Sequence, residues 1–204
     1  MTKIVAHRGA SSEAPGNTLA AFARAIDLGA DTIEFDVRRD QDRRLVISHD
    51  PVRGLGPELP TLEETLRLTR GRIQLDVELK EFGCERETVD LLLAYFSPSD
   101  FCITSFLAPV LHEIRTIESR IRTGLIFAGW NEAVRMECVS PYVDLLVAQY
   151  KILDEAEKIG KPLFVWTVDD PKLLWAYFAR PLIEGIVTNN PRQALSLRQE
   201  FAAN

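Results

Sequence analysis

Acidic residues at alternate positions are the first feature of this sequence that could carry chemistry. Glu34 and Asp36 stand two residues apart in the apolar run 31–37, and Glu78 has a similar place in the run 73–79. In an extended strand, residues two apart point to the same face, so these side chains are expected to share an interior. Carboxylates that lose water there repel one another unless a cation or hydrogen-bond donors compensate. Because the candidate ligands are all oxygens, we expect Mg²⁺ or Ca²⁺ rather than zinc.

The same acids also fit a purely structural role. Arg38 and Lys80 directly follow the two acidic runs and would neutralise the carboxylates in a rim of ion pairs without any metal. Structural ion-pair networks and functional sites perturb carboxylates in similar ways. The pattern by itself therefore leaves a metal site and a salt-bridged rim open.

Two histidines stand at strand ends. His7 directly follows the first apolar run of the chain, and His49 ends a later extended run. Both can change charge near neutral pH, which suits one acid and one base. Arg8 could hold a phosphate through two hydrogen bonds, and Gly9 would let the chain turn close to a ligand. With a cation, these groups would meet the needs of phosphodiester cleavage. Alternatively, the histidine caps a strand and the arginine forms a surface ion pair. The third histidine, His112, falls in a predicted helix, where a surface position accounts for it.

The elements that must position these residues alternate between strand and helix from end to end. Eight such units predict a parallel α/β sheet that closes into a (β/α)8 (TIM) barrel, since a doubly wound sheet usually has fewer strands. Barrel enzymes place their sites at the carboxyl ends of the strands. We expect one compact domain over 1–204, with a short or absent insertion after the second strand. Strands are predicted at 3–6, 31–37, 73–79, 101–104, 122–127, 143–147, 163–168 and at a run ending in 186–188, with a further extended run at 44–48.

Helix signals separate the strands. Asn17 is predicted to cap the first helix and Gly29 to end it, and Thr61 with Glu64 forms the capping box of the second. Residues 51–60, rich in proline and glycine, are predicted to form a loop. Further helices are predicted over 85–96, 107–117, 131–138 and 153–159, and after Pro171 and Pro191.

Composition excludes several classes of protein. The chain of 204 residues has 24 Lys and Arg against 30 Asp and Glu, a net charge of −6, which disfavours binding to nucleic acid or anionic membranes. No apolar run approaches the length of a membrane span, so no stable membrane insertion is expected. Three widely spaced cysteines favour buried thiols over disulfides or a zinc site. We expect a cytoplasmic protein that is a monomer or a weak homo-oligomer.

Taken in order, the motifs resemble those of the glycerophosphodiester phosphodiesterase family. Each is weak singly, and their order and their places at strand ends make the joint match specific. The resemblance covers almost the whole chain. The residues that carry it are His7-Arg8-Gly9, Pro15 to Thr18, Glu34-x-Asp36, His49-Asp50, Glu78-x-Lys80, Ser105-Phe106, Trp166 and Thr188-Asn189-x-Pro191.

The resemblance implies a barrel enzyme that hydrolyses glycerophosphodiesters, its small-molecule partners, to glycerol 3-phosphate and an alcohol with a divalent cation. It also implies roles for individual residues, although Trp166 would equally fit plain core packing. By similarity, Glu34, Asp36 and Glu78 bind the cation, His7 and His49 act as general acid and base, Arg8 and Lys80 contact the phosphate, and Phe106 and Trp166 line the pocket.

The chain departs from the family pattern at three places. Gly16 stands where the family usually has Glu, and Asn189 where it often has Asp. The segment after His49 is short, which predicts a more open site. These departures leave two alternatives open: a phosphodiesterase for a lysophospholipid or sugar phosphodiester, or a weakly active barrel that binds a phosphate ester. Retention of both histidines and all three strand-end carboxylates speaks against the weakly active barrel.

Overall fold

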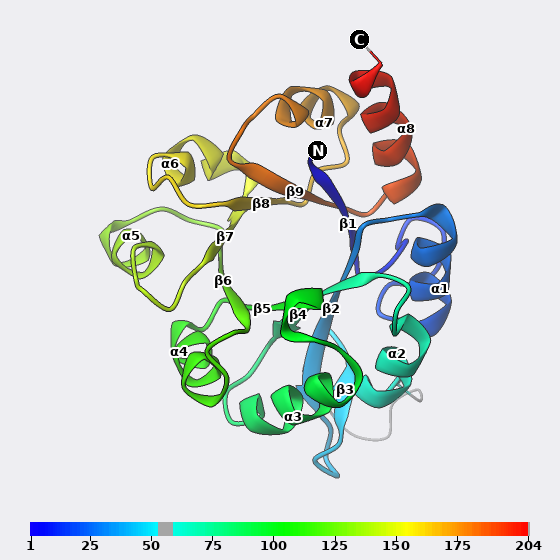
Figure 1. Ribbon diagram of the computed structural model, residues 1–204, viewed down its shortest axis with the longest axis vertical. Coiled ribbons are helices and arrows are strands. Elements are labelled where there is room, and N and C mark those ends of the chain that lie inside the picture. The colour runs from blue at the N-terminus through cyan, green and yellow to red at the C-terminus, as the bar shows by residue number, and fades with distance from the viewer. Residues whose placement is uncertain (53–58, 204) are drawn as a thin grey trace.

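The computed structural model describes residues 1–52 and 59–203. Over these residues, eight parallel strands close into a ring and the helices lie around its outside (Figure 1). The order around the ring is β1-β2-β4-β5-β6-β7-β8-β9, and β9 pairs with β1 to close it. The predicted (β/α)8 barrel is confirmed. Its strands are β1 (Lys3–His7), β2 (Thr32–Arg39), β4 (Gln74–Leu79), β5 (Phe101–Ser105), β6 (Arg122–Phe127), β7 (Leu145–Gln149), β8 (Leu163–Trp166) and β9 (Ile183–Thr188).

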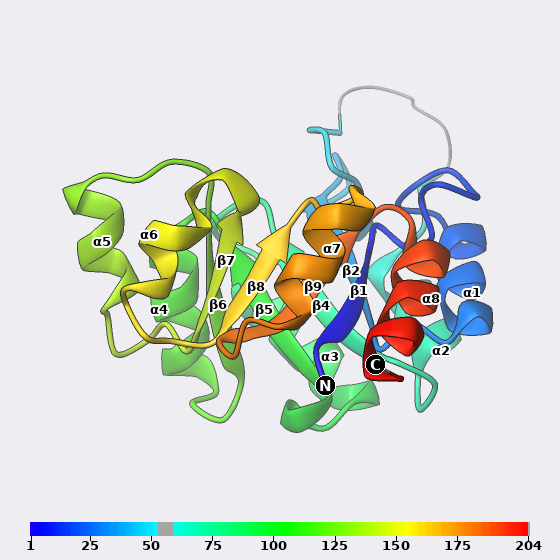
Figure 2. The same cartoon turned by 90° about the horizontal axis from the view of Figure 1, so that it is seen from above.

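Helices connect the strands and bury one face each against the outside of the barrel. The predicted helix near residue 131, which has the weakest sequence signal, is present as α5. Both chain termini lie at the end of the barrel opposite to the end at which the strands finish (Figure 2). The α-helices are α1 (Leu19–Leu28), α2 (Leu62–Thr69), α3 (Glu85–Tyr95), α4 (Ala108–Ile117), α5 (Glu132–Cys138), α6 (Leu153–Glu157), α7 (Pro171–Phe178) and α8 (Pro191–Ala202), with 3₁₀ turns at Pro98–Asp100 and Tyr150–Ile152.

Capping residues predicted from the sequence fix helix starts, and one predicted cap is corrected by the structure. The predicted capping box of α2 is present: the Thr61 hydroxyl accepts from the Glu64 N–H at 3.2 Å, and Glu64 Oε2 accepts from the Thr61 N–H at 2.8 Å. The prediction that Asn17 caps α1 is wrong. Thr18 is the cap, and its hydroxyl accepts from the backbone N–H of Ala21. The Asn17 side chain is thereby free to reach into the barrel.

The extended run after β2 forms a short strand outside the barrel. This strand, β3 (Leu45–Ile47), runs antiparallel to the end of β2, with Val37 beside Ile47. It returns the chain to the barrel mouth and places His49 there. Residues 53–58 of the predicted loop lie outside the described residues.

The barrel interior has two unlike halves. One half is apolar and comes mainly from β5 to β9, whereas β2 and β4 turn buried acids inward. The apolar layer between sheet and helices is larger and stabilises the fold by burial. All three cysteines are free and buried, as expected. Among the described residues, no helix is both long and apolar enough to cross a membrane. The interior apolar cluster is Val5, Cys102, Ile126, Leu145, Val147, Phe164 and Val187.

Candidate functional site

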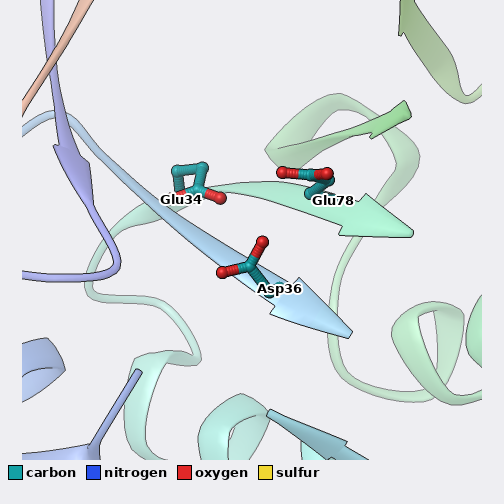
Figure 3. Close-up of side chains that lie close together, drawn as sticks. All are labelled: Glu34, Asp36 and Glu78. Carbon is teal, nitrogen blue, oxygen red and sulfur yellow. The ribbon is translucent and has the colours of Figure 1, made fainter. Parts of the chain in front are cut away.

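Three carboxylates meet at the ends of β2 and β4. The register of the two strands places Asp36 beside Glu78 and Glu34 beside Asp76. One oxygen each from Glu34, Asp36 and Glu78 lies within 4.8 Å of the others, and Figure 3 shows the three side chains facing one another. All three are buried, at 6%, 0% and 8% exposure respectively. The predicted convergence is confirmed, and the role of these residues as metal ligands stays a prediction.

Burial and mutual repulsion shape the charge of this cluster. Loss of water, together with the charges of Asp36 and Glu78, raises the pKa of Glu34 well above its usual value. Burial and the neighbouring Asp36 raise the pKa of Glu78 to about 7. Burial would also raise the pKa of Asp36, but Lys80, the Asn17 amide and Arg8 outweigh it and lower that pKa. Two of the three acids therefore resist full ionisation unless further positive charge is present.

Protein cations supply only part of that charge. Lys80 Nζ lies 2.6 Å from Glu78 Oε1 and 3.2 Å from Asp36 Oδ1, and Arg8 Nε lies 3.2 Å from Asp36 Oδ2. Asp36 Oδ1 is buried and accepts no hydrogen bond, although it forms the ion pair with Lys80. An oxygen-only set with one unsatisfied buried acceptor fits a hard divalent cation. The ion-pair rim considered above forms at Lys80 but not at Arg38, which pairs with Glu81 instead.

The turn after β1 brings His7 and Arg8 to the cluster. Gly9 has φ +82°, and a Cβ there would lie 2.6 Å from the carbonyl carbon of Ala21, so only glycine lets this turn pack against α1. The Arg8 N–H donates to Glu34 Oε2 at 2.9 Å. Both Arg8 (φ 56°) and Asn17 (φ 60°) adopt the left-handed backbone that other residues seldom adopt. Such conformations persist where surrounding contacts hold them, often at functional sites.

Asn17, predicted only as a helix cap, instead contacts the carboxylate cluster. Its Nδ2 donates to Asp36 Oδ2 at 2.7 Å, and its backbone N–H donates to the Arg8 carbonyl at 3.0 Å. It therefore fixes the central carboxylate of the cluster. Gly16, the departure from the family pattern, lies against Arg8: a Cβ at this position would come within 3.2 Å of the Arg8 Cβ. Thr18, the next residue, is also a good N-cap. Because either residue could cap the helix, the sequence also allowed the Asn17 side chain to point into the site.

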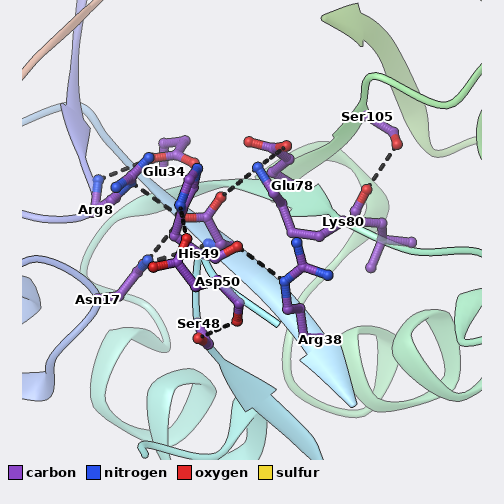
Figure 4. A network of polar contacts seen from close by, with 12 residues as sticks. Arg8, Asn17, Glu34, Arg38, Ser48, His49, Asp50, Glu78, Lys80 and Ser105 are labelled. Atoms are coloured by element: carbon purple, nitrogen blue, oxygen red, sulfur yellow. Dashed lines mark hydrogen bonds and ion pairs between the residues drawn. The ribbon is translucent and has the colours of Figure 1, made fainter. Parts of the chain in front are cut away.

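The two histidines differ in their surroundings. His7 is largely enclosed: its Nε2 lies 4.0 Å from Glu34 Oε2, its Nδ1 lies 2.7 Å from Asn189 Oδ1, and burial lowers its pKa. The His49 side chain is 45% exposed, and its Nδ1 lies 2.8 Å from Asp50 Oδ1. Arg38 Nε donates to the His49 carbonyl at 2.9 Å, which anchors this residue to β2 (Figure 4).

Aromatic side chains complete the mouth of the barrel. Phe106 and Trp166 pack edge to face with ring centroids 5.7 Å apart, and Trp166 Nε1 donates to the Val147 carbonyl at 2.9 Å. Trp166 therefore both packs and lines the site, so the two expectations for it are not exclusive. A pocket of about 120 Å³ opens between the two halves of the interior. It is lined by His7, Arg8, Glu34, His49, Glu78, Lys80, Phe106 and Trp166, and also by Asp76, Thr104, Ile126, Val147 and Val187.

Asp76 is a fourth buried acid near the cluster and was not among the predicted site residues. It lies beside Glu34 in the register, two residues before Glu78 on β4, and accepts from the Thr104 hydroxyl at 2.7 Å. Burial raises its pKa to about 6. The alternation of acids along β4 is the signal that could have identified it.

Comparison with known proteins agrees with this geometry. The model of the glycerophosphoryl diester phosphodiesterase family matches residues 7–69. A glycerophosphodiester phosphodiesterase of Caldanaerobacter subterraneus subsp. tengcongensis is 27% identical, over 96% of this chain and 97% of that protein. The crystal structure of a glycerophosphodiester phosphodiesterase from Parabacteroides distasonis shares the fold, with a TM-score of 0.82, 24% identity and 98% of each chain covered. So does a phosphodiesterase of Oleispira antarctica in complex with the product sn-glycerol-3-phosphate, with a TM-score of 0.84, 21% identity and coverage of 98% of this chain and 97% of that one.

The closed barrel, with acids and histidines at the carboxyl ends of its strands, defines a barrel enzyme of the phosphoric diester hydrolase class. The sequence and structural comparisons agree with each other over almost the full length of the chain. The chain is thus similar, over almost its full length, to proteins of the glycerophosphodiester phosphodiesterase family.

Proposed function

We propose that this protein hydrolyses glycerophosphodiesters to glycerol 3-phosphate and an alcohol, and that the reaction requires a divalent cation, Mg²⁺ or Ca²⁺. The observation that carries the proposal is the buried cluster of Glu34, Asp36 and Glu78 in one pocket with two histidines. Nothing in barrel packing requires this set, and the similarity to glycerophosphodiester phosphodiesterases supports the same chemistry.

Each group has a task that follows from its place. When bound, the cation neutralises phosphate charge and polarises the phosphoryl oxygens. Arg8 and Lys80, whose side chains point to the cluster, would contact the remaining phosphate oxygens. His7 and His49 would move protons at the attacking and the leaving oxygen, and the exposed His49 stands where an alcohol can depart. Phe106 and Trp166 would cover the apolar side of the substrate.

A turnover assay tests the metal requirement. Release of glycerol 3-phosphate from glycerophosphocholine should disappear when the cation is removed with a chelator and should return when Mg²⁺ or Ca²⁺ is restored. Activity that survives complete metal removal would refute the metal mechanism. An inactive protein with metal bound would favour the phosphate-ester-binding barrel.

Histidine variants test the acid and base. His7→Ala and His49→Ala should each lower the rate by about 10²–10⁴-fold. His112→Ala is the matched control, because His112 packs against Tyr142, with ring centroids 5.3 Å apart, and does not line the pocket. A rate close to that of the unmodified protein in either active-site variant would remove that residue from its role.

A lysophospholipid is a second candidate substrate. The connection from β5 to α4 exposes Phe106 and Leu107 at the mouth, at 46% and 40%, where an acyl chain would find apolar surface. A human lysophospholipase D is 40% identical over 50 residues, 24% of this chain and 16% of that protein. Comparing kcat/KM for lysophosphatidylcholine and glycerophosphocholine decides between the two substrates. The cytoplasmic location and the monomeric or weakly associated state stay predictions.

A further inference from the structure

A chain of polar contacts leads away from His7 on the side opposite the carboxylates. His7 Nδ1 lies 2.7 Å from Asn189 Oδ1, and Asn189 Nδ2 donates to Asp169 Oδ2 at 2.6 Å. Asp169 Oδ1 also accepts from the Asn189 backbone N–H at 2.8 Å and from the Thr188 hydroxyl at 2.8 Å. The carboxylate of Asp169 is thus held by three donors at and just after the end of β9, and the Asn189 side chain bridges it to the imidazole.

The chemistry of this chain settles which way the Asn189 amide faces. An ionised carboxylate only accepts hydrogen bonds, so the NH₂ group of Asn189 must face Asp169. Its carbonyl oxygen then faces His7 and also accepts from the Ser11 hydroxyl at 3.1 Å. A carbonyl oxygen can only accept a hydrogen bond, so the ring nitrogen that faces it, His7 Nδ1, must carry the proton. In the neutral ring, Nε2 is left as an acceptor on the side of Glu34 and the pocket.

We propose that Asn189 and Asp169 are positioning residues that hold neutral His7 in the Nδ1–H tautomer, so that Nε2 takes up the proton and His7 is the base of the reaction. The role as base rests on the proposed function, whereas the tautomer does not. The proposal also accounts for Asn rather than Asp at position 189. An uncharged acceptor orients the imidazole ring without adding a negative charge beside it. The charged groups around the imidazole are then Arg8, Glu34 and Asp36, with Asp169 behind the amide.

Nitrogen NMR tests the tautomer directly, because the chain has only three histidines. Long-range ¹H–¹⁵N correlations on the ¹⁵N-histidine-labelled protein, at about pH 8.5 where an ordinary histidine is neutral, distinguish a protonated from an unprotonated ring nitrogen. Variants His49→Ala and His112→Ala assign the signals by elimination. We expect His7 to show a protonated Nδ1 and a free Nε2, the reverse of the form that an unconstrained imidazole favours in water.

Substitutions then test whether Asn189 and Asp169 determine the His7 tautomer. Asn189→Leu removes the acceptor and should shift His7 toward the Nε2–H form, with kcat lowered by about 10²-fold and KM little changed. Asn189→Asp keeps an acceptor and should retain the Nδ1–H form. Ser11→Ala should also retain it, because Asp169 still orients the amide. Should Asn189→Leu fail to fold, Asp169→Asn tests the same point, since it allows the amide to turn over.

Two outcomes overturn the proposal: a protonated Nε2 on His7 in the unmodified protein, or an unchanged Nδ1–H pattern in both Asn189→Leu and Asp169→Asn. A failure of the proposed function gives a different result. In that case His7 keeps the predicted tautomer, but the unmodified protein releases no glycerol 3-phosphate even with Mg²⁺ or Ca²⁺ present.

Discussion

The charge of the carboxylate cluster should make the metal-free protein less stable as the pH rises, and Glu78→Gln should remove much of that effect. Burial and Asp36 raise the pKa of Glu78 from 4.5 to about 7. At pH values between 4.5 and about 7, Glu78 keeps its proton in the native state and releases it in the unfolded chain. Stability contributed by the raised pKa is therefore fully present below pH 4.5 and is lost as the pH rises through about 7.

The size of the loss follows from the same pKa change. Each unit of pKa difference corresponds to about 1.4 kcal/mol, so ionising Glu78 costs the folded state about 3 kcal/mol. Gln has nearly the same shape and no charge. The free energy of unfolding of the Glu78→Gln variant should therefore fall by about 3 kcal/mol less than that of the unmodified protein between acidic and mildly basic pH.

Urea unfolding followed by tryptophan fluorescence, in the presence of a chelator and across this pH range, measures the difference. Glu155→Gln is the matched control, because Glu155 forms an ion pair with Lys158 on the surface of α6. Addition of Mg²⁺ or Ca²⁺ should flatten or reverse the slope of the unmodified protein, since the cation binds the ionised form. Parallel stability curves for Glu78→Gln and the unmodified protein in chelator would refute this reasoning.

Three further substitutions test the supports of the site. Asn17→Leu removes the donor to Asp36 and should weaken cation binding by about 1–3 kcal/mol, measured by calorimetric titration; unchanged affinity would remove Asn17 from the site. Arg38→Met frees the His49 carbonyl and should lower kcat while leaving cation affinity intact, whereas a loss of both would indicate general disruption. Gly16→Ala places a methyl group 3.2 Å from the neighbouring arginine side chain and should raise KM for the phosphodiester with little change in Tm; an unchanged KM would show that this arginine can shift freely.

The barrel and most of its site could be predicted from sequence because their signals are local. Strand alternation alone places Glu34 and Asp36 on one face, and the parallel order of the strands then brings Glu78 beside them. The caps mark where the helices begin, so each strand must end before its cap. His7 and its neighbours, which stand between a strand and the next helix, are thereby placed at the barrel mouth.

The remaining parts depend on contacts that no local pattern encodes. Asn17 and Thr18 are both good caps, and only the three-dimensional path of the turn decides that Thr18 caps the helix. Asp169 meets Asn189 because β8 and β9 are neighbours in the barrel. Arg38 follows the inward alternation of β2 but lies beyond the barrel end, where Glu81 rather than the cluster is in reach.

The division of the barrel interior into an ionic and an apolar half has an evolutionary consequence. The groups proposed to perform the chemistry all come from residues 7–80, and the apolar wall that faces them comes from later strands. On the proposed function, reaction and selectivity are encoded in largely separate stretches of the gene, which meet in contacts such as His7–Asn189 and Asp76–Thr104. We expect changes in the later stretch, at positions such as Phe106, to alter which alcohol is accepted while the cleavage step is inherited unchanged. Exchange of this segment between relatives is accordingly a direct route to new specificity.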